Sequence, residues 1–133
     1  MSKFQAFFKQ NVEAVENQPL HLKRFGEPLM IRAVSAKENG QIQERCFKNA
    51  KGRNGKPEKV FEVSRYNKEF SIAAIAEPNL HDKELQESWG VLGADALFDA
   101  MFNAGEANAI LEKATEISGV NNSISEDIEE AKN

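Results

Sequence analysis

The sequence has few of the residues from which catalytic and metal centres are usually built. Its 133 residues include one cysteine, Cys46, and two histidines, His21 and His81. A single cysteine cannot form an internal disulfide, which fits a reducing compartment. A structural zinc site normally needs four Cys or His ligands, and the chain has three. We expect Cys46 to be a small buried hydrophobic residue, since no local signature supports a catalytic Cys–His pair.

Further absences narrow the class of function. Neither nucleotide fingerprint, GxxxxGK[ST] or GxGxxG, is present, and the carboxylates show no pairing typical of acid–base catalysis. We therefore expect a protein that is not an enzyme and holds neither cofactor nor metal ion. No apolar run approaches the roughly 18 residues of a membrane helix. The opening MSKFQAFFKQ lacks the long apolar segment of a signal peptide, so a cytoplasmic protein is expected.

What the chain does contain is typical of one globular domain. Hydrophobic residues make up 41% and charged residues 29%, with a net charge of −4. We expect a single α+β domain over residues 1–119, with a helical C-terminal part over 80–119. The last stretch, 120–133, is polar and acidic, which predicts a flexible tail.

Hydrophobic spacing predicts the elements of the first half. A helix is expected over 2–17, with Phe4, Phe7 and Phe8 on an apolar face that docks inward. Alternating residues predict a β-hairpin over 20–34, and KVFEV predicts a strand near 59–63. The fold expected is thus α+β, a small antiparallel sheet of about three strands packed by the N-terminal helix, a central buried helix and a C-terminal helical subdomain.

Capping residues and apolar faces predict the remaining helices. Ser35 and Glu38 have the spacing of a capping box, which begins a helix running to about Lys48. Apolar residues around most of the cylinder predict the central helix over 65–77. The last third holds a short helix capped by Asp82 and two more, over 95–102 and 103–119, of which the second ends at a glycine.

The segment from Arg45 to Lys68 is strongly basic. It contains eight Lys or Arg against Glu58 and Glu62, a local net charge of +6. Glycine, asparagine and proline predict a loop over 48–59. Such a loop can bind phosphates, so a small nucleic-acid-binding module acting through Lys51, Arg53 and Lys56 is an alternative function. Because the chain as a whole has a net charge of −4, a solvated loop without nucleic-acid contact is favoured over this alternative.

Several apolar stripes exceed what a small sheet can cover. Unclaimed apolar surface commonly marks a protein partner, and methionine adds an adaptable contact. We therefore predict a partner-binding surface on the C-terminal helices, composed of Leu97, Phe98, Met101, Phe102, Ile110 and Leu111.

Four stretches in a particular order carry a family resemblance. They are FFKQNVEAVEN (7–17), KRFGEPLMIRAVSAKEN (23–39), AEPNLHDKELQESWGV (76–91) and AGEANAILEKATEISG (104–119). In this order and spacing the chain, from about Phe4 to Gly119, resembles the XkdN-like tail assembly chaperones of long-tailed bacteriophages and related prophages. The aromatic–glycine pair Trp89–Gly90 also lies where such a pair is expected.

The resemblance implies a role in virion assembly. Chaperones of this kind bind the tape measure protein, a long helix-rich chain, and keep it soluble until tail tube subunits polymerise around it. The tail tube protein is therefore a second candidate partner. The resemblance also implies action in the host cytoplasm and absence from the mature virion. It carries no binding motif at the level of single residues.

Overall fold

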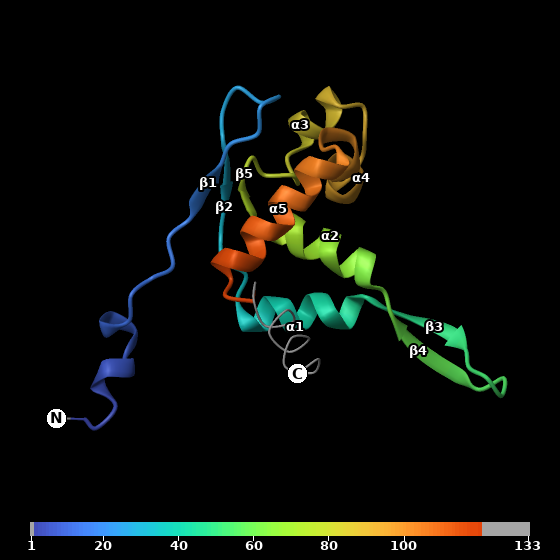
Figure 1. Ribbon diagram of the computed structural model, residues 1–133, viewed down its shortest axis with the longest axis horizontal. Helices are drawn as coiled ribbons and strands as arrows, with labels where there is room; N and C mark the ends of the chain where they lie inside the picture. Colours follow the sequence, from blue (N-terminus) through green and yellow to red (C-terminus); the bar gives the residue numbers. More distant parts are fainter. Residues whose placement is uncertain (1, 121–133) are drawn as a thin grey trace, which may run out of the picture.

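The computed structural model describes residues 2–120, so the tail expected over 120–133 lies outside the described residues except for Val120. Within that range the chain forms an α+β domain of five α-helices, a three-stranded antiparallel sheet and a separate two-stranded sheet (Figure 1). The fold class expected from the sequence is confirmed.

The main sheet is built around its middle strand. Strand β1 (Gln18–Leu20) pairs antiparallel with β2 (Leu29–Ile31), which pairs antiparallel with β5 (Ile75–Glu77). The hairpin predicted near 20–34 is therefore present. On β2, Leu29 and Ile31 are buried and the residue between them is only half-buried, the alternation of a strand with one face against the core.

The third strand of this sheet is not the one that the sequence predicted. Residues 59–63 were expected to supply it, and 75–77 were expected to end the central helix. Helix α2 (Val63–Ala74) instead stops at Ala74, and the chain continues directly as β5. Pro78 follows, and proline disfavours the helical conformation in the residue before it, here Glu77. The chain thus leaves the helix early and pairs with β2.

The basic segment forms a hairpin where a loop was expected over 48–59. Strands β3 (Phe47–Lys51) and β4 (Pro57–Phe61) pair in register, and the hairpin projects from the body of the domain (Figure 1). Its connection turns at Gly55, whose φ of +75° suits glycine. Aromatic rings anchor the base of the hairpin. The ring centroid of Tyr66 lies 5.5 Å from that of Phe61, on the hairpin, and 5.8 Å from that of the buried Phe70.

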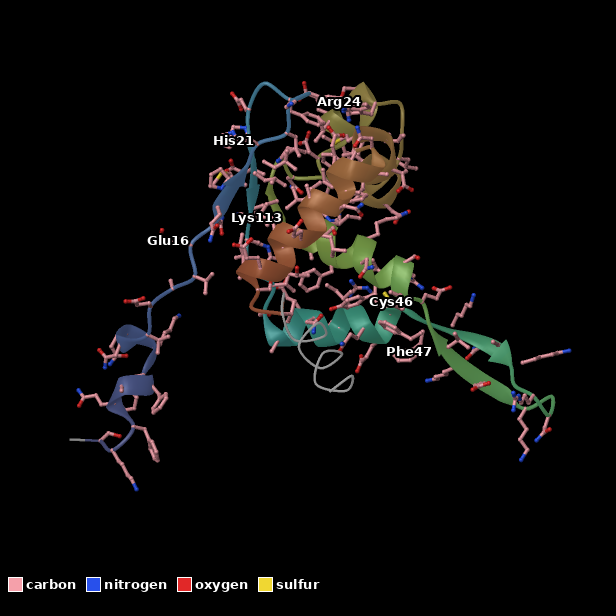
Figure 2. The ribbon with its side chains drawn as sticks, in the orientation of Figure 1. Glu16, His21, Arg24, Cys46, Phe47 and Lys113 are labelled. Atoms are coloured by element: carbon pink, nitrogen blue, oxygen red, sulfur yellow. The ribbon has the colours of Figure 1, made fainter. Side chains whose placement is uncertain are left out.

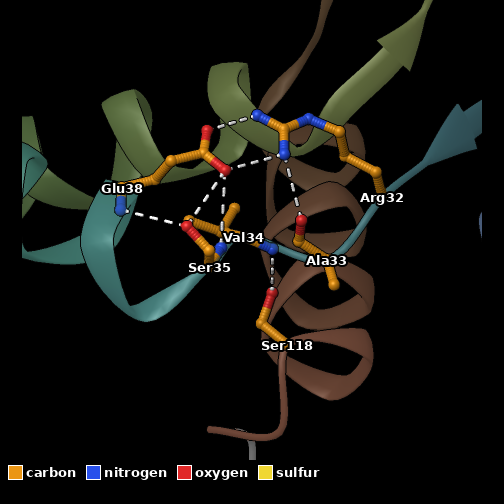
Figure 3. A network of polar contacts seen from close by, with 6 residues as sticks. All are labelled: Arg32, Ala33, Val34, Ser35, Glu38 and Ser118. Atoms are coloured by element: carbon orange, nitrogen blue, oxygen red, sulfur yellow. Dashed lines mark hydrogen bonds and ion pairs between the residues drawn. The ribbon is translucent and has the colours of Figure 1, made fainter. Parts of the chain in front are cut away.

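The capping box predicted at Ser35 is present and belongs to a larger polar network (Figure 3). The Glu38 backbone N–H donates to Ser35 Oγ at 3.1 Å, at the start of α1 (Ala36–Arg45). The Glu38 carboxylate accepts a 3.0 Å hydrogen bond from Arg32, which lowers the pKa of that carboxyl to about 2. Ser118 Oγ accepts the N–H of Val34 at 2.9 Å. The network joins the C-terminal end of the helix Ala104–Ile117, whose cap is Ser118, to the start of α1.

The C-terminal part is helical, as predicted. Helices α3 (Lys83–Ser88) and α4 (Ala94–Met101) are short, and α5 (Ala104–Ile117) is the longest helix among the described residues. Asp82 caps α3 with a 2.9 Å hydrogen bond from the Leu85 N–H. Gly119, with a φ of +80°, follows α5 and permits the left-handed turn beyond it.

One hydrophobic core joins the sheet to the helices. Helix α5 crosses α2 and the three-stranded sheet (Figure 1). The side chains that lie deepest come from β2, α2, the segment after β5, α4 and α5. They are Ile31, Phe70, Leu80, Leu97 and Ile110.

The helix predicted over 2–17 is absent. Its place is taken by two single turns of 3₁₀-helix, η1 (Gln5–Phe7) and η2 (Lys9–Asn11), followed by extended chain. Every residue from 2 to 17, here called the arm, is exposed. Without a surface to cover its apolar face, so short a helix is marginal. The Asn11 side chain also donates to the Gln5 carbonyl at 2.8 Å, which competes with a helical hydrogen bond.

Candidate functional site

An open groove with an apolar floor lies at the end of the domain formed by the loop between β1 and β2, β5 and α3. Its volume is about 540 Å³, within the range of roughly 300–1,000 Å³ typical of ligand pockets. Leu29 and Met101, both buried, are at its base. Its lining includes Phe25, Glu27, Leu29, Glu77, Leu85 and Trp89.

Arg24 holds the loop side of the groove in place. Its Nε donates to Glu106 Oε2 at 2.9 Å and its Nη2 to the Met101 carbonyl at 2.6 Å, with a second bond from Nη2 to the Glu106 carboxylate. Figure 2 places Arg24 at the end of the domain where α3 and α4 lie. The guanidinium also stands over the Phe25 ring, 5.1 Å from its centroid. The Phe25 ring in turn lies 5.7 Å from that of Phe102.

Glu106 has two tasks in this arrangement. Its carboxylate accepts the N–H of Asn103 at 2.9 Å in the capping box of α5, and it pairs with Arg24. The hydrogen bond from Arg24 and the backbone hydrogen bond from Asn103 hold the pKa of Glu106 below its ordinary value. The start of α5 and the groove loop are therefore fixed by one carboxylate, which stays ionised at neutral pH.

A buried glutamine holds the α3 side. The Gln86 side chain donates to the Leu80 carbonyl at 2.9 Å and accepts the N–H of Gly93 at 2.9 Å. These two bonds fix the chain on both sides of α3 and so position Trp89, which is 39% exposed. Three residues further along, Leu92 is 91% exposed. An apolar floor with a large exposed aromatic beside it is suited to receiving apolar side chains.

The charges that line the groove are negative. Glu27 and Glu77, both exposed, contribute carboxylates from its two sides. An apolar ligand that also carries Lys or Arg would match both the floor and these carboxylates. The arrangement is suited to binding such a ligand.

A family model matches most of the chain. The model of the phage XkdN-like tail assembly chaperone protein matches residues 4–132. The chain belongs to this family. The match confirms the resemblance seen in the sequence. A role in phage tail assembly follows from membership of the family.

A solved structure has the same fold as this family member. The crystal structure of the protein YqbN superimposes with a TM-score of 0.67 at 16% sequence identity, over 90% of this chain and 98% of that one. At that identity the likeness concerns the fold alone. No curated protein matches the sequence.

The partner surface predicted on the C-terminal helices is not exposed in this family member. Of the six residues named from the sequence, Leu111 alone is half-buried, and the other five lie in the core. They are Leu97, Phe98, Met101, Phe102 and Ile110. The expectation of an exposed stripe was wrong because α4 and α5 pack against α2 and the sheet, which buries all of these side chains except Leu111. Only Met101 touches the groove described above.

A cluster of exposed apolar residues lies at the opposite end of the chain, in the arm. Phe4, Phe7 and Phe8 are 61%, 78% and 41% exposed, and Val12 and Val15 are 56% and 63% exposed. They were expected to dock inward as one helix face. The sequence signal for the groove was weaker, namely the lone tryptophan and the Gly26–Pro28 turn, and neither indicates by itself what lies next to it.

The basic residues of the alternative function lie at the tip of the β3–β4 hairpin. Lys51, Arg53 and Lys56 are exposed there. At the hairpin base is an open cleft of about 840 Å³ whose charges are paired. Glu62 lies 3.7 Å from Lys48 and 3.6 Å from Arg65. The structure thus adds no feature, such as a stacking platform, that would favour nucleic acid over a solvated hairpin.

The single cysteine is engaged in packing. Cys46 is fully buried and its thiol donates to Glu69 at 3.2 Å. Burial, together with the hydrogen bond and charge of Glu69, raises the pKa of the thiol to about 11. Across residues 2–120, no cluster of His, Cys, Asp or Glu is arranged to bind a metal ion. In the same residues no helix combines the length and apolar character needed to cross a bilayer.

Proposed function

We propose that this protein binds the tape measure protein and keeps it soluble while the tail tube assembles, using the groove beside Trp89 as its binding site. The observation that carries this proposal is a preformed, open, apolar-floored groove in a member of a tail assembly chaperone family. The groove is fixed from both sides by hydrogen-bonded side chains, so a client would not have to order it.

The physical need for such a site comes from the client. A long helix-rich chain awaiting assembly exposes apolar stripes that would otherwise aggregate. A groove can take the large side chains of one face of an amphipathic helix, which are spaced at three and four residues. At about 540 Å³ the groove accommodates a few side chains and not a whole helix. Each contact is then modest in strength, which allows release when tube subunits polymerise.

The charges define the client segment further. Glu27 and Glu77 favour a stripe with Lys or Arg next to its apolar residues. We propose that this binding takes place in the host cytoplasm and that the chaperone is absent from the mature virion. Neither step requires catalysis or a cofactor. The tail tube protein is the second phage component whose binding should be measured.

Co-expression with the tape measure protein of the same phage tests the function. The soluble fraction of the tape measure protein should rise several-fold, and it should co-purify with this chain. The variant Trp89→Ala should lose most of that gain. Val60→Ala is the matched control, because Val60 is 40% exposed but lies on the β3–β4 hairpin. No gain in solubility and no co-purification would overturn the proposed function, and equal loss in both variants would overturn the proposed site.

A further inference from the structure

The arm and the groove carry a second inference. We infer that the arm of one molecule docks in the groove of a second copy of this chain, and that reciprocal exchange of two arms closes a dimer. The inference shares the groove with the proposed function but does not need the tape measure protein. It concerns the form that the protein takes when the client is absent.

Among residues 2–120 the arm is an apolar segment that no other part of the domain covers. Its three phenylalanines are all at least 41% exposed. The backbone hydrogen bonds that shape it run within it, such as the 2.9 Å bond from the Phe7 N–H to the Phe4 carbonyl. Exposed apolar side chains gathered in one segment are characteristic of a surface that is covered by a partner.

The direction of the arm points to a second molecule. Residues Gln18 and Leu20 pair with Ile31 and Leu29, so β1 enters the sheet at its Ile31 end and leaves at its Leu29 end. The groove lies at the Leu29 end. The arm extends from the other end, away from the domain (Figure 1). Figure 2 shows Glu16 on the arm side of β1 and Arg24 at the far end.

Charge and chemistry match between the two surfaces. The arm contains Lys3 and Lys9 and no acidic residue before Glu13. Its phenylalanines are therefore accompanied by positive charges only. The groove presents an apolar floor and the carboxylates of Glu27 and Glu77. The phenylalanine-bearing part of the arm, residues 3–9, thus has both properties that the groove favours, and the two glutamates of the arm, Glu13 and Glu16, lie beyond it.

Symmetry then defines the assembly. An arm and a groove are different surfaces, so a single contact leaves one arm and one groove unfilled. Reciprocal exchange about a two-fold axis fills both grooves and both arms, and two-fold dimers are the commonest closed oligomers. The arm joins β1 through extended chain, which gives it the reach to cross to a neighbour.

Sedimentation velocity of the full chain over a concentration series, without client, tests the inference. The wild type should shift from the monomer mass of 14.9 kDa to twice that value as concentration rises. Phe7→Ser should raise the dissociation constant at least tenfold. At concentrations where the wild type is monomeric it should not alter the thermal midpoint, since Phe7 is 78% exposed. Val63→Ser is the control, because Val63 is 60% exposed and lies outside the arm and the groove. This variant should change the dissociation constant less than twofold.

Two further measurements separate this contact from general stickiness. An equimolar mixture of Phe7→Ser and Trp89→Ala should regain dimer, because one intact arm meets one intact groove. Lys9→Glu should weaken the dimer, and adding Glu27→Lys to the same chain should restore it. A wild type that stays monomeric throughout, or a dimer unaffected by Phe7→Ser, overturns the inference. Neither result bears on client solubility in co-expression, so the two proposals fail separately.

Discussion

Arg24 and Glu106 lie 82 positions apart in the chain and are joined by two hydrogen bonds, one of them 2.9 Å long. Arg24 lies in the loop between β1 and β2, which forms one side of the groove, and Glu106 lies in the first turn of α5. The Glu106 carboxylate thus makes a long-range contact with Arg24 and a local one with Asn103, whose N–H it accepts in the capping box of α5. The shape of the groove therefore depends on the correct start of α5.

Removing Arg24 should loosen the groove. In Arg24→Ala, the loop loses its bonds to Glu106 and to the Met101 carbonyl. We expect a lower thermal midpoint and a red shift in the fluorescence of Trp89, the single tryptophan, as the groove becomes more hydrated. The neighbouring exposed residue supplies the control Lys23→Ala, which should leave both signals unchanged. An unchanged emission maximum in Arg24→Ala would show that the pair does not hold the groove.

The burial of the C-terminal stripe predicts different costs for two adjacent substitutions. Ile110 is fully buried and Leu111 is only half-buried. Ile110→Ala should lower the free energy of unfolding by about 2–5 kcal/mol, since it removes core contacts and leaves a cavity. Leu111→Ala should cost about 1 kcal/mol. Urea unfolding followed by circular dichroism measures both. Equal, small costs would mean that Ile110 lies on the surface after all.

Acid should weaken the network around Glu38. Hydrogen bonding from Arg32 holds the pKa of Glu38 at about 2, below its ordinary value of 4.5. A lowered pKa contributes stability that is present above about pH 4.5 and is lost as the pH falls from there through 2. Because both side chains are about a third exposed, the contribution should not exceed about 1 kcal/mol.

The comparison is made by urea unfolding at pH 7 and pH 3. Glu38→Gln should be less stable than the wild type at pH 7, and the difference should shrink at pH 3. Glu44→Gln, an exposed position of the same helix, is the control and should show a smaller difference at pH 7. A deficit in Glu38→Gln that stays constant between the two pH values would contradict the linkage.

Cys46 should be inert in the folded protein. With no exposed surface and a pKa of about 11, roughly one thiol in a thousand is ionised at pH 8, and the thiolate is the reactive form. Labelling with a thiol-reactive disulfide reagent should be at least a hundredfold slower in buffer than in concentrated urea. Equal rates in the two solvents would contradict the burial of this side chain.

Features encoded within a few residues were predicted well. The caps at Ser35 and Asp82 and the terminating Gly119 occur where their local patterns indicate. Such interactions involve side chains and backbone groups within one turn, so the sequence window contains every participant. The hairpin near 20–34 and the central helix were likewise predicted from the spacing of apolar residues along a short stretch of chain.

Features that depend on what lies opposite an apolar face were predicted poorly. Phe7 and Ile110 both belong to stripes at helical spacing, yet Phe7 is 78% exposed and Ile110 is fully buried. The pattern states that a face is apolar and does not say which surface covers it. The same ambiguity assigned the third strand to 59–63, because pairing with β2 is a choice between distant segments.

The sequence by itself determined the family, the α+β class, most helix boundaries and the absence of nucleotide-binding motifs, since each depends on residue identity and short-range order. Only the tertiary structure decided that the C-terminal stripe is core, that the arm is bare, and that Arg24 and Glu106 frame a groove beside Trp89. Burial and ion pairing between distant segments depend on how the whole chain packs, and packing is a property of all its faces together.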